Sequence, residues 1–477
     1  MIKKLQNYDV IIVGGGPGGS MAAKTAAEKG LKAIFFERGR KPGEKNSSGC
    51  GLGPRMWRKW PDLMKQLTPE KCPSMRAGKY ARNYLVDNQG EVSAMILARP
   101  TESVTYEPAK SFITMNCYRS DFDPWIADIA VNAGAELANS KLITGLLKEN
   151  GNVNGVIDEK GEKYRAPIVI GADGAVSMVA KQSGLRDKWY HDHITLVPQY
   201  DFYAPREKID LIMHEEALAV WWMAGGIPSA YQVFFGDGFH IGLGNWMHSW
   251  EKNPLYYLNY VVNLPHFQRL IKMLDAKPRE VQAHLLPWMP YPEKTYSNGV
   301  ILIGDAAGFP CPLEAEGIFP AMESAEIAIE VAAEAIAEGD YSENKLKEYE
   351  RRWQEESSIG TEFEAGPELW SVWKALPFNA KNMDWFIPMV SEALTGIFDW
   401  SEPHKVRLRQ ILAHVKKYLP KAMPTLMSEF VPLFTKVLEE DMGGLIDPSM
   451  LPMLVNSLPK LMSLMPDPKK KKRRKNK

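Results

Sequence analysis

The sequence predicts an α/β fold: a Rossmann-type βαβ domain, an inserted β-rich domain and a helical C-terminal extension. Three observations lead to this prediction. The N-terminal stretch YDVIIVGGGPGGSMAAKTAAEKGLKAIFFERG has the order strand, glycine turn, helix and strand. Residues from about 186 to 290 alternate aromatic and polar side chains, which is typical of strands. After about residue 340 the pattern is helical and repeatedly interrupted by proline.

The βαβ unit contains the first motif that indicates a ligand. Gly14-x-Gly16-x-x-Gly19 follows an apolar strand at Val10–Val13 and opens a helix, and Glu37 ends the next strand. Glycines allow the tight turn and the close approach of a ligand to the backbone, while a helix N-terminus attracts a pyrophosphate. A carboxylate at the end of the second strand accepts hydrogen bonds from ribose hydroxyls. The unit therefore predicts a dinucleotide, either NAD or FAD.

Two later motifs favour FAD. GADGAVS at 171–177 follows a predicted strand at Ile168–Ile170, and GDAAGF at 304–309 follows another strand. An aspartate among small residues after a strand suits a ribityl or ribose hydroxyl, and the next helix can direct its N-terminal dipole at a flavin. Each motif alone is also compatible with an ordinary Asp-Gly turn. The three motifs in this order point to FAD.

With these motifs the chain resembles the p-hydroxybenzoate-hydroxylase-like FAD enzymes over roughly residues 8–340. The resemblance implies that Asp305 contacts the ribityl chain, that Gly308 and the following residues pass near the isoalloxazine ring, and that Arg119 lies near the flavin. The residues predicted to bind FAD are Gly14, Gly16, Pro17, Gly18, Gly19, Glu37, Arg38, Gly49, Arg119, Asp173, Gly174, Gly304, Asp305, Gly308, Gly317 and Ile318. The expected division is an FAD-binding domain at 1–185 and 291–340, a β-rich substrate domain at 186–290, a helical region at 341–465 and a basic tail at 466–477.

Two branches of that family match best. SGCGLGPR at 48–55 is similar to a stretch of geranylgeranyl reductases, as is GDAAGFPCPLEAEGI, with Ala315 where a glycine is usual. The longer SGCGLGPRMWRKWPD also resembles electron-transfer-flavoprotein:quinone oxidoreductases, which bring an iron–sulfur cluster that this chain lacks. We therefore expect an FAD-dependent oxidoreductase that passes electrons to a prenyl double bond of a membrane isoprenoid. The alternative is reduction of menaquinone or ubiquinone, alone or as a subunit of a membrane electron-transfer complex.

Other function classes stay open at this point. A docked electron-transfer subunit without a substrate pocket would fit the missing cluster, and an aromatic monooxygenase would fit the fold. The electron donor is expected to be ferredoxin, an electron-transfer flavoprotein or NAD(P)H, because the sequence shows no separate NAD(P)H domain.

The candidate catalytic residues are Cys50 and Trp222. By resemblance, the loop with Cys50 lies between flavin and substrate, so the thiol would contact the flavin or gate its reactive face; a free cysteine is also often a small buried hydrophobe. Trp221, Trp222 and Tyr231 are candidates to line an apolar tunnel for a prenyl chain or quinone, with core packing as the alternative. Two further residues qualify as proton donors by type alone, namely His214 and His240.

The bulk composition limits the remaining possibilities. The chain has 477 residues, 45% hydrophobic and 24% charged, which suits two or three domains. Four scattered cysteines without a CxxC pair argue against disulfides, zinc or an iron–sulfur cluster, so no metal is expected. The N-terminus does not resemble a signal peptide, and no stretch reaches about 18 apolar residues. We expect a cytoplasmic, peripherally membrane-associated protein.

The membrane expectation comes from the C-terminus. Residues 423–465 contain seven methionines and several Leu-Pro steps, and eight of the nine residues 469–477 are basic. An adaptable apolar segment beside a polybasic run suits an anionic membrane surface. A helical cap with a solvated tail is the alternative. Nucleic acid is not expected, because the rest of the chain has 50 basic against 58 acidic residues.

Overall fold

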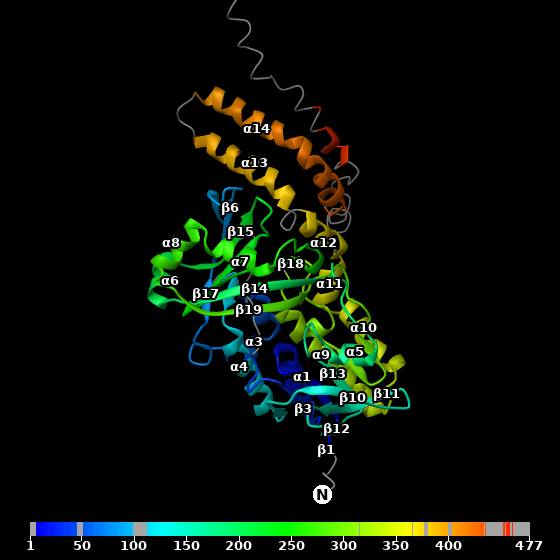
Figure 1. Cartoon of the computed structure of the whole chain (residues 1–477). Helices are drawn as coiled ribbons and strands as arrows, with labels where there is room; N and C mark the ends of the chain where they lie inside the picture. The colour runs from blue at the N-terminus through cyan, green and yellow to red at the C-terminus, as the bar shows by residue number, and fades with distance from the viewer. Residues whose placement is uncertain are drawn as a thin grey trace, which may run out of the picture.

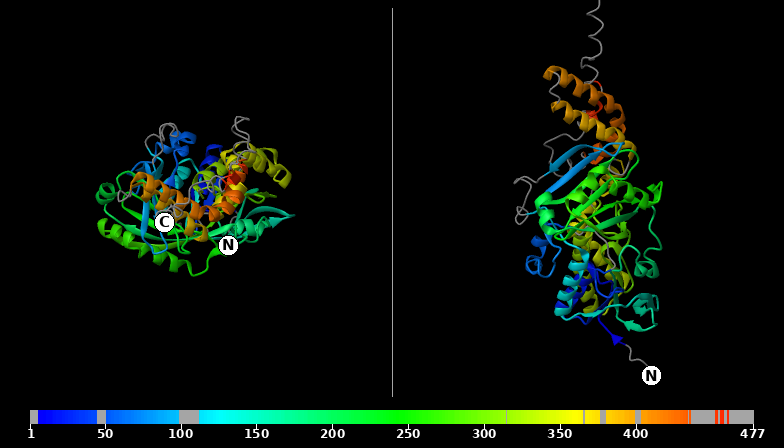
Figure 2. Two further views of the ribbon diagram at one scale, coloured as in Figure 1. Left: turned by 90° about the horizontal axis from the view of Figure 1, so that it is seen from above. Right: turned by 60° about the vertical axis from the view of Figure 1, so that its left-hand side comes forward.

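The computed structural model describes residues 6–44, 51–98, 112–313, 315–364, 366–375, 380–398 and 403–433, with 435, 452–453, 455–457 and 460. Figure 1 shows an elongated molecule in which one lobe holds the N-terminus, a second lobe is built on a large sheet, and a pair of helices lies at the far end. The right-hand view of Figure 2 shows the same order of parts. The fold class expected from the sequence is confirmed.

A six-stranded sheet forms the centre of the N-terminal lobe, in the order β20-β21-β13-β2-β3-β9. Its strands are β2 (Val10–Val13), β3 (Ala33–Phe36), β9 (Glu136–Ala138), β13 (Ile168–Gly171), β20 (Tyr296–Ser297) and β21 (Val300–Leu302). All neighbours are parallel except β20 with β21. Every residue of β2, β3, β13 and β21 is buried, which explains their continuous apolar sequences.

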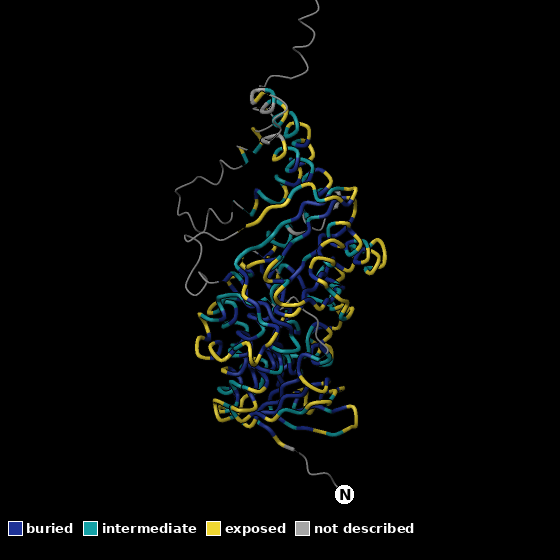
Figure 3. Tube along the Cα trace, turned by 90° about the vertical axis from the view of Figure 1, so that its left-hand side faces the viewer, coloured by how far each residue is buried: buried dark blue, intermediate teal, exposed yellow. Residues whose placement is uncertain are grey.

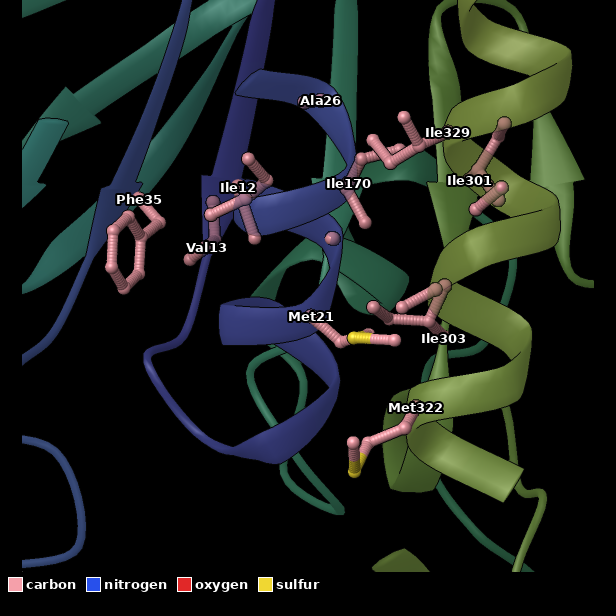
Figure 4. Packing of buried hydrophobic residues seen from close by; sticks show 14 of the residues in the cluster. Ile12, Val13, Met21, Ala26, Phe35, Ile170, Ile301, Ile303, Met322 and Ile329 are labelled. Atoms are coloured by element: carbon pink, nitrogen blue, oxygen red, sulfur yellow. The ribbon is translucent and has the colours of Figure 1, made fainter. Parts of the chain in front are cut away.

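Helices pack on this sheet and on each other. They are α1 (Pro17–Glu28), α4 (Arg119–Asn132) and α9 (Ile318–Glu338). Figure 4 shows part of this core, in which Ile170 of β13 lies near Ile329 of α9, and Met21 of α1 lies near Ile303, which follows β21. The packing fixes where α1 begins relative to β2, and therefore where the glycine loop lies.

The second lobe is an eight-stranded sheet, in the order β18-β14-β17-β16-β15-β6-β7, with β19 paired to β14. Its strands are β6 (Tyr80–Val86), β7 (Val92–Ala98), β14 (Ile194–Tyr203), β15 (Glu216–Met223), β16 (Ala230–Phe234), β17 (Gly238–Leu243), β18 (Asn245–Trp246) and β19 (Lys277–Pro287). A separate core lies between this sheet and the helices α6 (Arg206–Met213), α7 (Pro254–Val262) and α8 (Pro265–Met273). Since β6 and β7 precede residue 186, the sheet draws on two separated parts of the chain. The domain bounds stay a prediction.

Two smaller sheets pack against the two main sheets. One small sheet contains β1 (Gln6–Asn7), β10 (Ile143–Glu149), β11 (Asn152–Asp158) and β12 (Lys163–Arg165), and another contains β4 (Gly51–Leu52), β5 (Arg76–Gly78) and β8 (Thr114–Asn116). The short helices are α2 (Arg55–Lys59), α3 (Pro61–Met64) and α5 (Met178–Ser183).

The C-terminal region is helical, as the sequence predicts. It contains α10 (Glu343–Glu355), α11 (Ser358–Glu364), α12 (Gly366–Ala375), α13 (Ala380–Phe398), α14 (His404–Thr425) and a π-helical turn, η3 (Leu426–Phe430). Met383 and Ile387 of α13 pack on Leu85 and Ala224, so this helix is joined to the large sheet. Figure 3 shows buried residues concentrated in the lobes and more exposed ones on the helical pair. Among the described helices, none is long and apolar enough to cross a membrane.

Candidate functional site

A cavity of about 1300 Å³ lies between the two lobes. Its walls come from the glycine loop after β2, the residues that follow β13 and β21, and inward-facing residues of the eight-stranded sheet. Most small-ligand sites have volumes of roughly 300–1,000 Å³. The cavity therefore has room for a dinucleotide together with part of a second ligand.

Two glycines of the loop, Gly14 and Gly19, leave no space for a side chain. A Cβ on Gly14, whose φ is +111°, would stand 2.2 Å from the carbonyl oxygen of Ala172, and a Cβ on Gly19 would stand 1.9 Å from that of Gly14. Helix α1 begins at Pro17 with no side-chain cap at Gly16, and its first turn contains no acidic residue. Because Gly16 and Pro17 line the cavity, the dipole of α1 favours an anion there, such as a pyrophosphate.

Glu37 joins the glycine loop to the turn that follows β3. Its carboxylate accepts a hydrogen bond from the backbone N–H of Gly15 at 3.2 Å and another from Gly39 at 2.6 Å. The side chain is buried and lines the cavity. A carboxylate oxygen has lone pairs beyond those used by these donors, so it can still accept from a ribose hydroxyl.

Replacing Glu37 by glutamine is expected to weaken dinucleotide binding about tenfold. The amide has one acceptor oxygen, so its NH₂ group must face one of the two backbone N–H donors, and a charge-assisted hydrogen bond contributes roughly 1.5–3 kcal/mol. The dissociation constant can be measured by fluorescence quenching of the added dinucleotide. Glu28→Gln, on the exposed end of α1, is the matched control and should leave it unchanged. Equal constants for Glu37→Gln and the wild type would contradict the predicted role of this carboxylate.

The two motif aspartates both line the cavity but are held differently. Asp173 accepts hydrogen bonds from the Ser177 hydroxyl at 2.5 Å and from the backbone N–H of Val179 at 3.1 Å, so it also stabilises the start of α5. Burial raises the pKa of Asp173. Burial also raises the pKa of Asp305, against the opposing effects of His284 and Arg119.

Most of the predicted site residues lie together. The predicted residues that line the cavity are Gly14, Gly16, Pro17, Gly18, Glu37, Arg38, Arg119, Asp173, Gly174, Trp222, Gly304, Asp305, Gly317 and Ile318. Gly19 and Gly308 are not among the lining residues: Gly19 packs against Gly14, and Gly308 faces Met289 and Trp189. Gly49 and Cys50 lie outside the described residues. The individual role of each residue stays a prediction.

The alternation of a strand separates the candidate aromatic residues. Trp222 of β15 and Tyr231 of β16 line the cavity, as expected. Trp221 does not, because neighbouring residues of a strand point to opposite faces; it is fully buried in the other core, stacked on Tyr84 with ring centroids 4.2 Å apart. The two candidate histidines, His214 and His240, are not lining residues either.

The sequence reasoning missed several charged groups of the site. His284 of β19 lines the cavity, and burial lowers its pKa. Arg55 pairs with Glu316 and Glu362 and lies over the ring of Phe319 at 4.2 Å. Arg55 belongs to the motif SGCGLGPR and Glu316 to GDAAGFPCPLEAEGI, so both could have been predicted from these motifs. No local sequence pattern points to His284. Within the described ranges, no group of three or more histidine, cysteine, aspartate or glutamate side chains is arranged to hold a metal ion.

Comparison with known proteins agrees with this geometry. The family described as FAD binding domain matches residues 7–213. The digeranylgeranylglycerophospholipid reductase of Methanocaldococcus jannaschii is 30% identical over 357 residues, covering 73% of this chain and 82% of the relative. The corresponding reductase of Methanosarcina acetivorans is 32% identical over 361 residues, covering 73% and 81%.

Solved structures show the same fold. A geranylgeranyl bacteriochlorophyll reductase-like protein of Thermoplasma acidophilum has a TM-score of 0.66 at 22% identity, covering 89% of this chain and 99% of that protein. The halogenase PltM mutant, solved in complex with FAD, has a TM-score of 0.57 at 14% identity, covering 87% and 96%. The glycine loop, the cavity and these matches together identify the cofactor as FAD. The chain belongs to the geranylgeranyl reductase family of FAD-dependent oxidoreductases.

Proposed function

We propose that this protein reduces double bonds in the prenyl chains of a membrane lipid. The observation that carries the proposal is the composition of the cavity. One end has the dinucleotide loop, and the wall on the large sheet is mainly apolar, with Leu218, Val220 and Trp222 in succession on one face of β15. Relatives of this chain are named for reducing digeranylgeranylglycerophospholipid. An isoprenoid chain would lie along that wall.

FAD, when bound, supplies the two electrons that the reduction of a double bond requires. The glycine loop, Glu37 and Arg119 would hold it, with Asp173 and Asp305 on the same side of the cavity. The sheet wall would exclude water and align the chain. The predicted contribution of Cys50 rests on family resemblance alone. The electrons would come from ferredoxin, an electron-transfer flavoprotein or NAD(P)H.

Quinone reduction is the second candidate. Tyr231 and Gln199 place a hydroxyl and an amide in the otherwise apolar wall, joined by a hydrogen bond of 3.3 Å. A quinone carbonyl could use such a polar position, whereas a pure hydrocarbon chain has less need of it. An electron-transfer subunit without a pocket of its own is supported less well, because the cavity extends beyond what a dinucleotide needs.

The proposal is tested by mixing anaerobically reduced protein with digeranylgeranylglycerophospholipid in one experiment and with a short-chain menaquinone in another. Reoxidation of the flavin by the lipid, with a product heavier by two hydrogen atoms per reduced bond, supports prenyl reduction. Reoxidation by the quinone alone would transfer the proposal to quinone reduction. Val220→Trp puts a large side chain on the apolar wall of the cavity and should slow reoxidation by the lipid. Val281→Trp puts the same side chain at an exposed position of β19 and should not slow it.

We further propose that the C-terminal end contacts an anionic membrane surface. Lys416, Lys417 and Lys421 of α14 are exposed, and the basic tail follows in the sequence. Beside α13, the edge strand β7 exposes three consecutive apolar residues, Met95, Ile96 and Leu97, at 54%, 41% and 54%. Such a combination of basic and apolar groups favours binding at the surface of a bilayer.

Reversing the three lysine charges of α14 to glutamate should reduce binding to anionic phosphatidylglycerol vesicles at least tenfold, since each basic residue near such a surface contributes about 1 kcal/mol. Co-sedimentation measures the bound fraction, and neutral vesicles give the baseline. The same reversal at Lys148, Lys160 and Lys163, which are exposed in the N-terminal lobe, is the matched control. Equal losses in both triple variants would show a general charge effect and exclude α14 as the contact.

A further inference from the structure

A row of polar side chains continues from the cavity wall into the large sheet. The Tyr231 hydroxyl donates to the Gln199 amide oxygen at 3.3 Å, and the Gln199 amide nitrogen donates to Asp201 at 2.9 Å. Tyr231 and Gln199 line the cavity, whereas Asp201 lies behind them and is 3% exposed. The row therefore connects a group that a ligand can touch with a buried carboxyl.

The backbone fixes where the row meets the cavity. Gly242 of β17 stands opposite Tyr231 of β16 in the strand pairing. A Cβ on Gly242 would lie 2.5 Å from the Tyr231 hydroxyl oxygen and 2.7 Å from the ring carbon that bears it. The missing side chain thus makes the slot that holds the phenol. The position of the hydroxyl is set by the sheet, and only the direction of its hydrogen remains to be determined by its neighbours.

At the inner end of the row, His240 lies beside Asp201 without forming a hydrogen bond to it. The Nδ1 atom of fully buried His240 is 3.9 Å from Asp201, beyond hydrogen-bond reach. In the part of the chain that the structure describes, neither ring nitrogen of His240 has a hydrogen-bond partner. Burial lowers the pKa of His240 to about 3, so this ring is neutral and does not hold Asp201 in its ionised form. Most buried polar side chains have a hydrogen-bond partner, so a buried histidine without one calls for an explanation other than packing.

The surroundings leave Asp201 able to change its charge near neutral pH. Burial and the charge of Glu280, opposite it on β19, raise the pKa of Asp201 to about 7, against the lowering effects of Arg279 and of the hydrogen bond from Gln199. The ionisable side chains around it are His240 from β17, Glu280 and Arg279 from β19, Tyr231 from β16, and Tyr118 beside the start of α4. Burial, with the charge of Asp201, raises the pKa of Tyr231, so the phenol keeps its proton.

The charge of Asp201 decides which way the row is oriented. An ionised carboxylate only accepts, so it faces the NH₂ group of Gln199; the amide oxygen then takes the hydroxyl hydrogen of Tyr231. A protonated Asp201 can donate to that oxygen. The amide then turns its NH₂ group toward Tyr231, whose oxygen accepts and whose hydrogen points into the cavity.

We infer that Asp201 and Gln199 are positioning residues that control whether Tyr231 offers its hydroxyl hydrogen to the ligand in the cavity. The inference rests on the proposed function for the nature of that ligand, an isoprenoid whose electron-rich double bond is a weak acceptor. At low pH the hydroxyl faces the ligand as a donor, and as the pH rises through about 7 it turns away. The orientation of the hydroxyl is a property of the protein itself and exists without the lipid.

The direct test is ultraviolet resonance Raman spectroscopy of the FAD-loaded protein without lipid, at pH 6 and pH 8. Subtracting the spectrum of Tyr231→Phe isolates Tyr231, and its doublet distinguishes a hydroxyl that donates from one that accepts. The doublet is expected to change between the two pH values in the wild type and to be the same at both in Asp201→Asn, because the asparagine amide does not titrate. A wild-type doublet that does not change would overturn the inference.

A second measurement joins the row to ligand binding. The affinity of the oxidised protein for digeranylgeranylglycerophospholipid should fall several-fold from pH 6 to pH 8 in the wild type, be independent of pH in Asp201→Asn and remain low in Tyr231→Phe. Glu280→Gln should move the transition to lower pH, because it removes a negative charge that raises the pKa of Asp201. A wild-type pH profile in Asp201→Asn counts against the inference. A pH-dependent doublet without lipid binding would refute the proposed substrate and leave the inference standing.

Discussion

Gly14→Ala is expected to yield a protein that does not retain FAD. The residue has a φ of +111°, and the added Cβ would stand 2.2 Å from the carbonyl oxygen of Ala172 and 2.7 Å from its carbon. The backbone must shift at the point where the cavity meets the start of α1. Strain and overlap of this kind cost about 3 kcal/mol or more, which corresponds to roughly a hundredfold or greater loss of affinity. The ratio of flavin to protein absorbance, after purification and after reloading with FAD, measures how much FAD the variant retains.

Gly30→Ala separates this effect from simple backbone strain. Gly30 also has a positive φ, +76°, but nothing lies within 4 Å of the position of its Cβ, and it lies outside the cavity wall. Its replacement should cost about 1 kcal/mol of stability and leave the FAD content unchanged. If Gly14→Ala and Gly30→Ala both kept full FAD, the loop would not be the pyrophosphate site. If both lost it, the cause would be general destabilisation.

Arg55→Met is expected to destabilise the FAD-loaded protein by about 2 kcal/mol. Arg55 is the shared partner of Glu316 and Glu362 and covers the ring of Phe319. Breaking a buried pair costs roughly 3–5 kcal/mol, and the 24% exposure of the Arg55 side chain reduces that figure through solvent screening. Methionine keeps much of the contact with the ring. The midpoint of urea denaturation, at an unchanged slope, measures the loss.

Arg351→Met provides the comparison. Arg351 of α10 pairs with Glu348, Glu355 and Glu356, but at 41% exposure it belongs to a surface network. Exposed pairs contribute little, so its denaturation midpoint should match that of the wild type. A large shift for Arg351 and none for Arg55 would mean that the ion pairs around the cavity do not hold α2 to α11 and to the segment before α9.

Local sequence patterns were sufficient for the N-terminal lobe. The strand at Val10–Val13, the glycine loop and Glu37 lie close together in the sequence, and their spacing alone predicts a dinucleotide-binding site. The motifs with Asp173 and Asp305 each follow a strand, and parallel strands bring their carboxyl ends to the same edge of a sheet. These residues were predictable because periodicity and turn chemistry act over a few residues.

The large sheet was only partly predictable, because its partners are distant. Strand β6 lies more than a hundred residues before β15, yet the two pair in parallel, and no local pattern encodes such a pairing. The same holds for His284, which comes near Asp305 only through the pairing of β19 with β14. Trp221 and Trp222 show a finer limit: alternation says that they face opposite sides, and only the packed structure says which side is the cavity.

The strand order of the N-terminal lobe has a consequence for biosynthesis. β2 is made first, but it lies in the middle of its sheet beside β13, which itself pairs with β21 at Val300–Leu302. Gly317 and Ile318, which line the cavity, are made later still. While the ribosome is translating β14 to β19, β2 therefore already has both neighbours, but β13 still lacks β21 on its other side. FAD can be enclosed only when about two thirds of the chain has been synthesised, so cofactor loading is a late event in the life of the nascent protein.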